Sequence, residues 1–198
     1  MYDSDLALLS RIRRADTGAL AILLERHWAP VVTYVLGLLD SRDAAEDVAQ
    51  ETFVRLWERR EAWELEGSVR ALLLRVARNL SLDELRRRSA QERTARAAPR
   101  NALQLTPDEE LEKLEVRTVI ARAVESLPQR RREVFILVHH HGLSYREAAE
   151  VLDLSPQTVA NHLTMALADL RRLLMPHLYD RVNPTSGSQT DVTTDRSA

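Results

Sequence analysis

The sequence predicts an all-α protein of two small helical domains joined by a flexible linker, the second domain containing a helix-turn-helix. Its 198 residues include only five Gly and seven Pro, and long runs are rich in Leu, Ala, Arg and Glu. These residues favour helices, whereas the β-branched clusters typical of strands are few. With 44% hydrophobic and 29% charged residues, the chain can form packed cores in one or two domains.

Two helices of the first domain, residues 1–88, begin directly after serine residues. Ser41 precedes the run RDAAEDVAQETFVRLWERR, and Ser68 precedes VRALLLRVARNLSLDELRRR. Each serine can accept hydrogen bonds from the first free amides of its helix, which stabilises the helix by about 1 kcal/mol. In the first of these helices we expect the core residues to be Phe53, Val54 and Trp57, because they recur at helical spacing.

Charge is sorted along this part of the chain, although the net charge of the whole is only −2. Residues 40–66 carry nine acids and four arginines, a net of −5, whereas residues 67–100 carry nine arginines and three acids, a net of +6. Ordinary solvated helix faces would explain any one of these charges. Their separation into blocks favours a basic partner for the first segment and an acidic partner for the second.

A linker and a second domain are expected after the basic segment. Residues 89–105 are polar and rich in Ala and Arg, without an apolar stripe, and are predicted to form the linker. Thr106, Pro107 and Glu109 have the pattern of a capping box that opens the second domain, residues 106–178. The tail, residues 179–198, is rich in Ser and Thr and is expected to be disordered.

The run LSYREAAEVLDLSPQTVANHL, residues 143–163, predicts two helices separated by a tight turn. Ser144 and Glu147 form a capping box, and Asp153 tolerates a turn or left-handed conformation. Ser155 then caps a helix that Pro156 opens. This is the pattern of a helix-turn-helix, whose second helix enters the major groove of DNA.

The second of these helices has one apolar and one polar face. We expect the buried face to comprise Val159, Leu163, Ala166, Leu167 and Leu170. The outward face comprises Gln157, Thr158, Ala160, Asn161 and Thr164. Gln and Asn amides can bond adenine edges, and a Thr methyl can contact the methyl of thymine. A plain helical hairpin with solubilising outer residues is the alternative interpretation.

Several function classes receive no support from the sequence. There is no Cys, so disulfides and thiolate metal sites are excluded and a reducing compartment is plausible. No run reaches the ~18 uninterrupted apolar residues of a membrane span, and the start MYDSDLALL lacks the features of a secretory signal. We therefore expect a cytoplasmic protein without membrane insertion.

A metal-dependent enzyme is the most distant alternative, suggested by His139, His140 and His141. Consecutive helical residues point about 100° apart, so these three side chains do not converge on one ion without other ligands. A helix C-terminus before Gly142 is the ordinary explanation. The chain has no HExxH spacing, no phosphate-binding glycine loop and no nucleophile elbow. We predict no catalytic residue, no metal site and no cofactor.

Three runs of the sequence together carry a family resemblance. They are DAAEDVAQETFVRLWERR, RALLLRVARNLSLDELRRR and LPQRRREVFILVHHHGLSYREAAEVLDLSPQTV. Over about residues 5–175 they resemble the extracytoplasmic-function (ECF) sigma factors, the smallest members of the sigma-70 family of bacterial RNA polymerase initiation subunits. The first run matches the family's DAEDxxQExFxxxW segment at Asp43, Glu46, Asp47, Gln50, Glu51, Phe53 and Trp57.

The resemblance implies a role for each domain, the first as sigma region 2 and the second as sigma region 4. Binding of the polymerase core is implied for Asp43, Glu46, Asp47, Gln50 and Glu51. Binding of DNA at the −10 element is implied for Arg75, Arg78, Asn79, Asp83, Arg86, Arg87 and Arg88. Binding at the −35 element is assigned to Ser155, Gln157, Thr158, Asn161 and His162. An anti-sigma factor is a further expected partner, and a stress or envelope-signal regulon the expected target.

The sequence departs from the family pattern at two places. Leu72 and Leu74 stand where the family usually has Trp and another aromatic residue, so stacking on a melted base is not expected there. The run TVANHL lacks the basic residues that the family often carries in its recognition helix, and it resembles response-regulator output domains. A free-standing helix-turn-helix regulator is therefore the alternative function.

Overall fold

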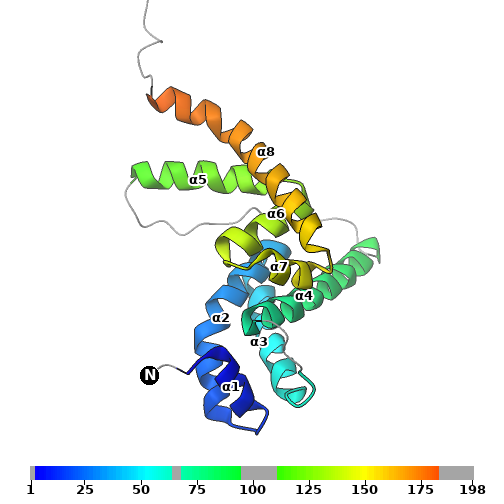
Figure 1. Cartoon of the computed structure of the whole chain (residues 1–198). Coiled ribbons are helices and arrows are strands. Elements are labelled where there is room, and N and C mark those ends of the chain that lie inside the picture. Colours follow the sequence, from blue (N-terminus) through cyan, green and yellow to red (C-terminus); the bar gives the residue numbers. More distant parts are fainter. Residues whose placement is uncertain (1–2, 64–67, 95–110, 183–198) are drawn as a thin grey trace, which may run out of the picture.

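The computed structural model describes residues 3–63, 68–94 and 111–182, and these residues form helices without a strand (Figure 1). The order is α1 (Asp5–Ile12), α2 (Thr17–Leu39), α3 (Arg42–Glu58), α4 (Val69–Thr94), α5 (Leu111–Glu125), α6 (Gln129–Phe135), the π-helical turn η1 (Ile136–His140), α7 (Tyr145–Leu152) and α8 (Pro156–Val182). The predicted all-α class is confirmed. The capping box expected at Thr106, Pro107 and Glu109 lies outside the described residues.

The helix starts follow the predicted caps. The Ser41 Oγ accepts from the Ala44 amide at 3.5 Å, and the Ser68 Oγ accepts from the Ala71 amide at 3.1 Å. Two helices are longer than the predicted domain bounds: α4 runs past residue 88 to Thr94, and α8 runs past residue 178.

Helix α2 lies at the centre of the first domain and packs against α1, α3 and α4. Its buried residues, among them Leu23, Val31 and Val35, recur at helical spacing on one face. By length and composition α2 is apolar enough to cross a membrane, the one such helix in the described part of the chain. Its packing on three neighbouring helices is that of a core helix.

One hydrophobic core runs through both predicted domains. Helix α4 packs against α7, and the same buried cluster contains Leu73 and Leu74 of α4 together with Leu137 of η1 and Leu152 of α7. A smaller cluster joins α5 and α8. The two domains thus lie against each other in the described structure: α7 packs on α4, and residues of α2 and α6 line one groove (Figure 1).

Two residues predicted to be buried are exposed instead. Val54 on α3 is 40% exposed and Leu167 on α8 is 44% exposed. Each directly follows a buried residue, Phe53 or Ala166, and so points about 100° away from the buried face. The apolar stripes of α3 and α8 are narrower than the sequence suggested.

Candidate functional site

Helix α3 presents an acidic face to solvent. Its opposite face is buried through residues such as Ala45, Ala49 and Phe53. The five predicted polymerase-binding residues, Asp43, Glu46, Asp47, Gln50 and Glu51, are exposed or partly exposed. Two of them form ion pairs along the helix, Glu46 with Arg42 at 2.9 Å and Glu51 with Arg55 at 2.8 Å. Asp43, Asp47 and Gln50 are the exposed members of this acidic face.

An open groove of about 530 Å³ separates this acidic face from the arginine-rich part of α4. Asp47 and Glu51 line one side of the groove, and Asp83, Glu84 and Arg87 line the other. The α3 side of the groove is thus acidic, whereas the α4 side carries both signs of charge.

The arginines at this end of α4 are bound by carboxylates of their own helix. Arg86 pairs with Asp83 at 2.9 Å, and Glu84 accepts from both Arg87, at 2.8 and 2.9 Å, and Arg88, at 2.7 Å. The hydrogen bond from Arg87 and that from Arg88 hold the pKa of Glu84 at about 2. A phosphate that binds Arg87 or Arg88 must therefore compete with Glu84 or use the guanidinium N–H groups that Glu84 leaves free.

The predicted DNA-binding residues in the first half of α4 are partly exposed and partly buried. Arg75 and Asn79 are exposed. Arg78 is only 6% exposed, and its Nη2 lies 3.4 Å from the Oε2 of Glu133 on α6, which is itself buried. In this arrangement of the domains Arg78 is covered and cannot contact DNA.

The helix-turn-helix has the local geometry that its sequence predicts. Ser144 and Glu147 form a complete capping box, with the Ser144 amide 2.8 Å from the Glu147 carboxylate. Asp153 adopts the left-handed conformation, with φ at 56°. Ser155 accepts from the Thr158 amide at 3.1 Å, and their two hydroxyl groups lie 2.8 Å apart. Both hydroxyl groups therefore take part in the hydrogen bonds that cap the start of α8.

Two amides stand side by side on the exposed face of α8. The Nε2 of Gln157 donates to the Oδ1 of Asn161 at 3.1 Å, one helical turn away. His162 is turned inward by comparison, since it is half-buried and its Nδ1 is buried without a hydrogen-bond partner in the protein. Of the predicted −35 residues, Gln157 and Asn161 form the pair most available to a ligand.

The three histidines have separate environments. The ring of His139 lies 4.9 Å from that of Phe135, whereas His141 is buried with its ring edge-on to Tyr34 at 5.5 Å. His140 is exposed. Within residues 3–63, 68–94 and 111–182, no group of three or more His, Cys, Asp or Glu residues is arranged to hold a metal ion.

Comparisons with known proteins bear on the whole chain. Residues 23–91 match the family model of sigma-70 region 2, and residues 117–170 match that of sigma-70 region 4. The ECF RNA polymerase sigma factor SigL of Mycobacterium tuberculosis (strain H37Rv) is 33% identical over 173 residues, which cover 85% of this chain and 96% of SigL. The chain belongs to the ECF sigma factors.

The chain is also similar to other sigma factors. SigW of Bacillus subtilis is 23% identical over 176 residues, 84% of this chain and 94% of SigW. Among solved structures, that of CnrH in complex with the cytosolic domain of CnrY has a TM-score of 0.65 and 26% identity, covering 88% of this chain and 99% of the other. Region 2 of this ECF sigma factor thus spans most of α2 to α4, and the region 4 match runs from within α5 to within α8.

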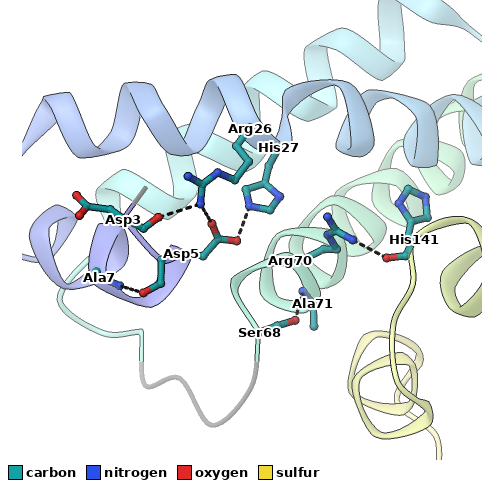
Figure 2. A network of polar contacts seen from close by, with 10 residues as sticks. Asp3, Asp5, Ala7, Arg26, His27, Ser68, Arg70, Ala71 and His141 are labelled. Atoms are coloured by element: carbon teal, nitrogen blue, oxygen red, sulfur yellow. Dashed lines mark hydrogen bonds and ion pairs between the residues drawn. The ribbon is translucent and has the colours of Figure 1, made fainter. Parts of the chain in front are cut away.

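The sequence missed the residues that join the two regions of this ECF sigma factor. In the network of Figure 2, Arg70 of α4 donates to the backbone carbonyl of His141 at 2.7 Å. Glu133 and His141 lie on one buried helical stripe with Leu137 between them. These three residues are spaced four apart, so helical periodicity could have predicted that Glu133 is buried with Leu137. A buried carboxylate needs a partner, which would have pointed to an ion pair.

Proposed function

We propose that this chain binds core RNA polymerase through the acidic face of α3 and directs promoter-specific initiation through α4 and the helix-turn-helix. The observation that carries the proposal is the exposed acidic face of α3 beside the basic end of α4, within a chain of the ECF family. Transcription takes place in the cytoplasm, where we expect the protein to act as a regulator and not as an enzyme. A regulon that answers stress or envelope signals is the expected target.

Run-off transcription with purified core polymerase tests this function. We expect core polymerase with this chain to initiate at discrete sites across a promoter library, whereas core polymerase alone does not. A chain that binds specific DNA but neither binds core polymerase nor confers initiation would instead be a free-standing regulator. The family membership favours the sigma factor over that alternative.

The acidic face of α3 is proposed to meet a basic surface of the polymerase, and Asp47 is exposed near its middle. Asp47→Arg places a like charge against that surface, so we expect at least a tenfold loss of affinity for core polymerase with unchanged helicity. Glu25→Arg makes the same change at an exposed position of α2 and serves as the control. Equal affinity of Asp47→Arg and the wild type, measured by titration with labelled core, would rule out this contact.

The arginines at the end of α4 are proposed to bind backbone phosphates and not bases. Replacing Arg86, Arg87 and Arg88 by Gln should weaken promoter binding by holoenzyme evenly across sequences. The log-log salt dependence should flatten by up to about 0.9 for each lost duplex contact. The exposed Arg13 of the N-terminal region offers a control substitution. An effect confined to one base position would contradict phosphate binding.

A further inference from the structure

A groove of about 490 Å³ lies where α2 and α4 of region 2 meet α5 and α6 of region 4. Its apolar walls include Leu36, Leu85 and Ile136. A volume of this size is typical of sites for small organic molecules, which bury most of their surface against apolar side chains. None of the residues predicted to bind polymerase or DNA lines this groove, so the proposed function leaves it unused.

Two side chains of the groove lining carry buried polar atoms without a hydrogen-bond partner in the protein. These atoms are the Tyr34 hydroxyl and Glu133 Oε1, in residues that are 2% and 3% exposed. The other oxygen of Glu133, Oε2, lies 3.4 Å from Arg78 and 3.3 Å from Arg130. Burial, and after it the charge of Glu133, raises the pKa of Tyr34, so its hydroxyl keeps its proton. A buried polar atom without a partner is costly, so a ligand that donates to Glu133 Oε1 gains affinity from that pairing.

The charges around the groove favour a cation. Asp40, Glu125 and Glu133 line it, whereas Arg132 is the basic residue among its described lining residues. Asp40 and Glu125 are exposed, and within the described part of the chain their carboxylates have no partner. Gln129 and Arg132 have long side chains that are likewise not bonded to another described residue, so they are free to turn aside and let a head group reach Glu133.

The backbone also leaves room at this groove. Gly37 lines it from within α2, although glycine inside a helix is less stable than alanine. A Cβ at Gly37 would meet no atom outside its own helical backbone within 4 Å, so packing does not require the glycine. On the opposite side Ile136 begins η1, and its carbonyl accepts from the His141 amide at 3.0 Å. Such wide π-helical turns are frequent at functional sites.

We propose that this groove binds a small organic cation, whose ammonium or guanidinium head donates to Glu133 Oε1 and the Tyr34 hydroxyl while its apolar body packs on the leucine and isoleucine side chains of the walls. Two exposed carboxylates, Asp40 and Glu125, attract the cation to the groove. A head group with several N–H donors fits one free carboxylate oxygen beside one hydroxyl. The site does not depend on the proposed function, because binding needs neither polymerase nor DNA.

Chemical-shift titration of the isotope-labelled full chain tests the site. The probes are agmatine, which carries a guanidinium and an ammonium group on a methylene chain, and benzamidine, which carries an amidinium group on a benzene ring. We expect at least one of them to bind saturably, with a dissociation constant of about 1 mM or less. The amide signals of Gly37 and Ile136 should shift, whereas that of Gly18, at the other end of α2, should not. No saturable shift with either probe, or equal shifts with magnesium chloride, would overturn the proposal.

Two variants separate the proposed contacts from general attraction of cations. Tyr34→Phe removes only the unpartnered hydroxyl, so the chain should keep its fold and lose at least threefold in affinity for the probe. Asp40→Asn removes a carboxylate from the groove and should also weaken binding severalfold. Asp153→Asn makes the same change at another exposed, left-handed helix end outside the groove, and it should bind as the wild type does. Wild-type affinity in both Tyr34→Phe and Asp40→Asn would refute the assigned contacts.

A further pair of variants tests the location of the ligand. Gly37→Phe places a ring in the open space beside α2 and should abolish binding of the probe. Gly37→Ala adds only a methyl group there, so it should retain binding and a helix at least as stable as that of the wild type. Undiminished binding by Gly37→Phe would place the probe elsewhere on the chain and overturn the proposal.

Discussion

Lowering the pH from 6.5 to 5 is expected to reduce the free energy of unfolding by about 2 kcal/mol through His141, since each pH unit below the unfolded pKa costs about 1.4 kcal/mol. Burial, reinforced by the charges of His140 and Arg70, lowers the pKa of His141 to about 4. In this range the unfolded chain binds a proton at His141 and the folded chain does not. The contribution of His141 to the free energy of unfolding is therefore fully present above pH 6.5 and is lost as the pH falls towards 4.

Urea unfolding at a series of pH values measures this effect. His141→Phe keeps an aromatic ring against Tyr34 and removes the titrating group, so its stability should fall less steeply between pH 6.5 and 5. Burial also lowers the pKa of His27, which adds a slope of the same sign to both proteins. The difference between them therefore isolates His141.

Two further points complete this test. Glu84, whose pKa lies at about 2 in the folded chain, stays ionised there throughout this window, and its small contribution is common to the wild type and His141→Phe. Equal slopes for His141→Phe and the wild type would show that His141 takes up its proton in the folded chain as readily as in the unfolded one.

Asn161→Ala is expected to cost about 1 to 3 kcal/mol against the preferred base of the −35 element and to relax selectivity at a single position. Because Gln157 donates to the Oδ1 of Asn161, the Asn161 amide group stays free to donate and the Gln157 carbonyl stays free to accept. One donor beside one acceptor matches the N7 and N6 groups of adenine in the major groove. The paired amides therefore favour an A·T pair.

Transcription from a saturation-mutated promoter library checks this prediction. Since the two amides are bonded to each other, the effects of Gln157→Ala and Asn161→Ala should not add in the double variant. Ala160→Arg is the contrasting substitution, because a new phosphate contact should raise affinity evenly across sequences. Identical base preferences of Asn161→Ala and the wild type would show that Asn161 is a solvated residue without a role in recognition.

Local features of this protein followed from the sequence because they depend on neighbours in the chain. Ser41, Ser68 and Ser144 cap their helices as expected, and Asp153 forms the left-handed turn of the helix-turn-helix. Each of these contacts joins residues at most a few positions apart. The acidic face of α3 and the exposed amides of α8 were predictable for the same reason, since helical periodicity places them opposite a buried stripe.

The sequence could not show which exposed charges become buried when the two regions meet. By spacing, Arg78 fits a row of arginines predicted to bind DNA, yet it pairs with Glu133, 55 positions along the chain. His141 is buried at the contact between the regions, where its ring meets Tyr34 of α2, and this burial is the main cause of its lowered pKa. Periodicity identifies the faces of single helices, but the choice of partner depends on apolar packing between α4 and α7, far apart in the sequence. That packing determines whether Arg78 faces DNA or Glu133.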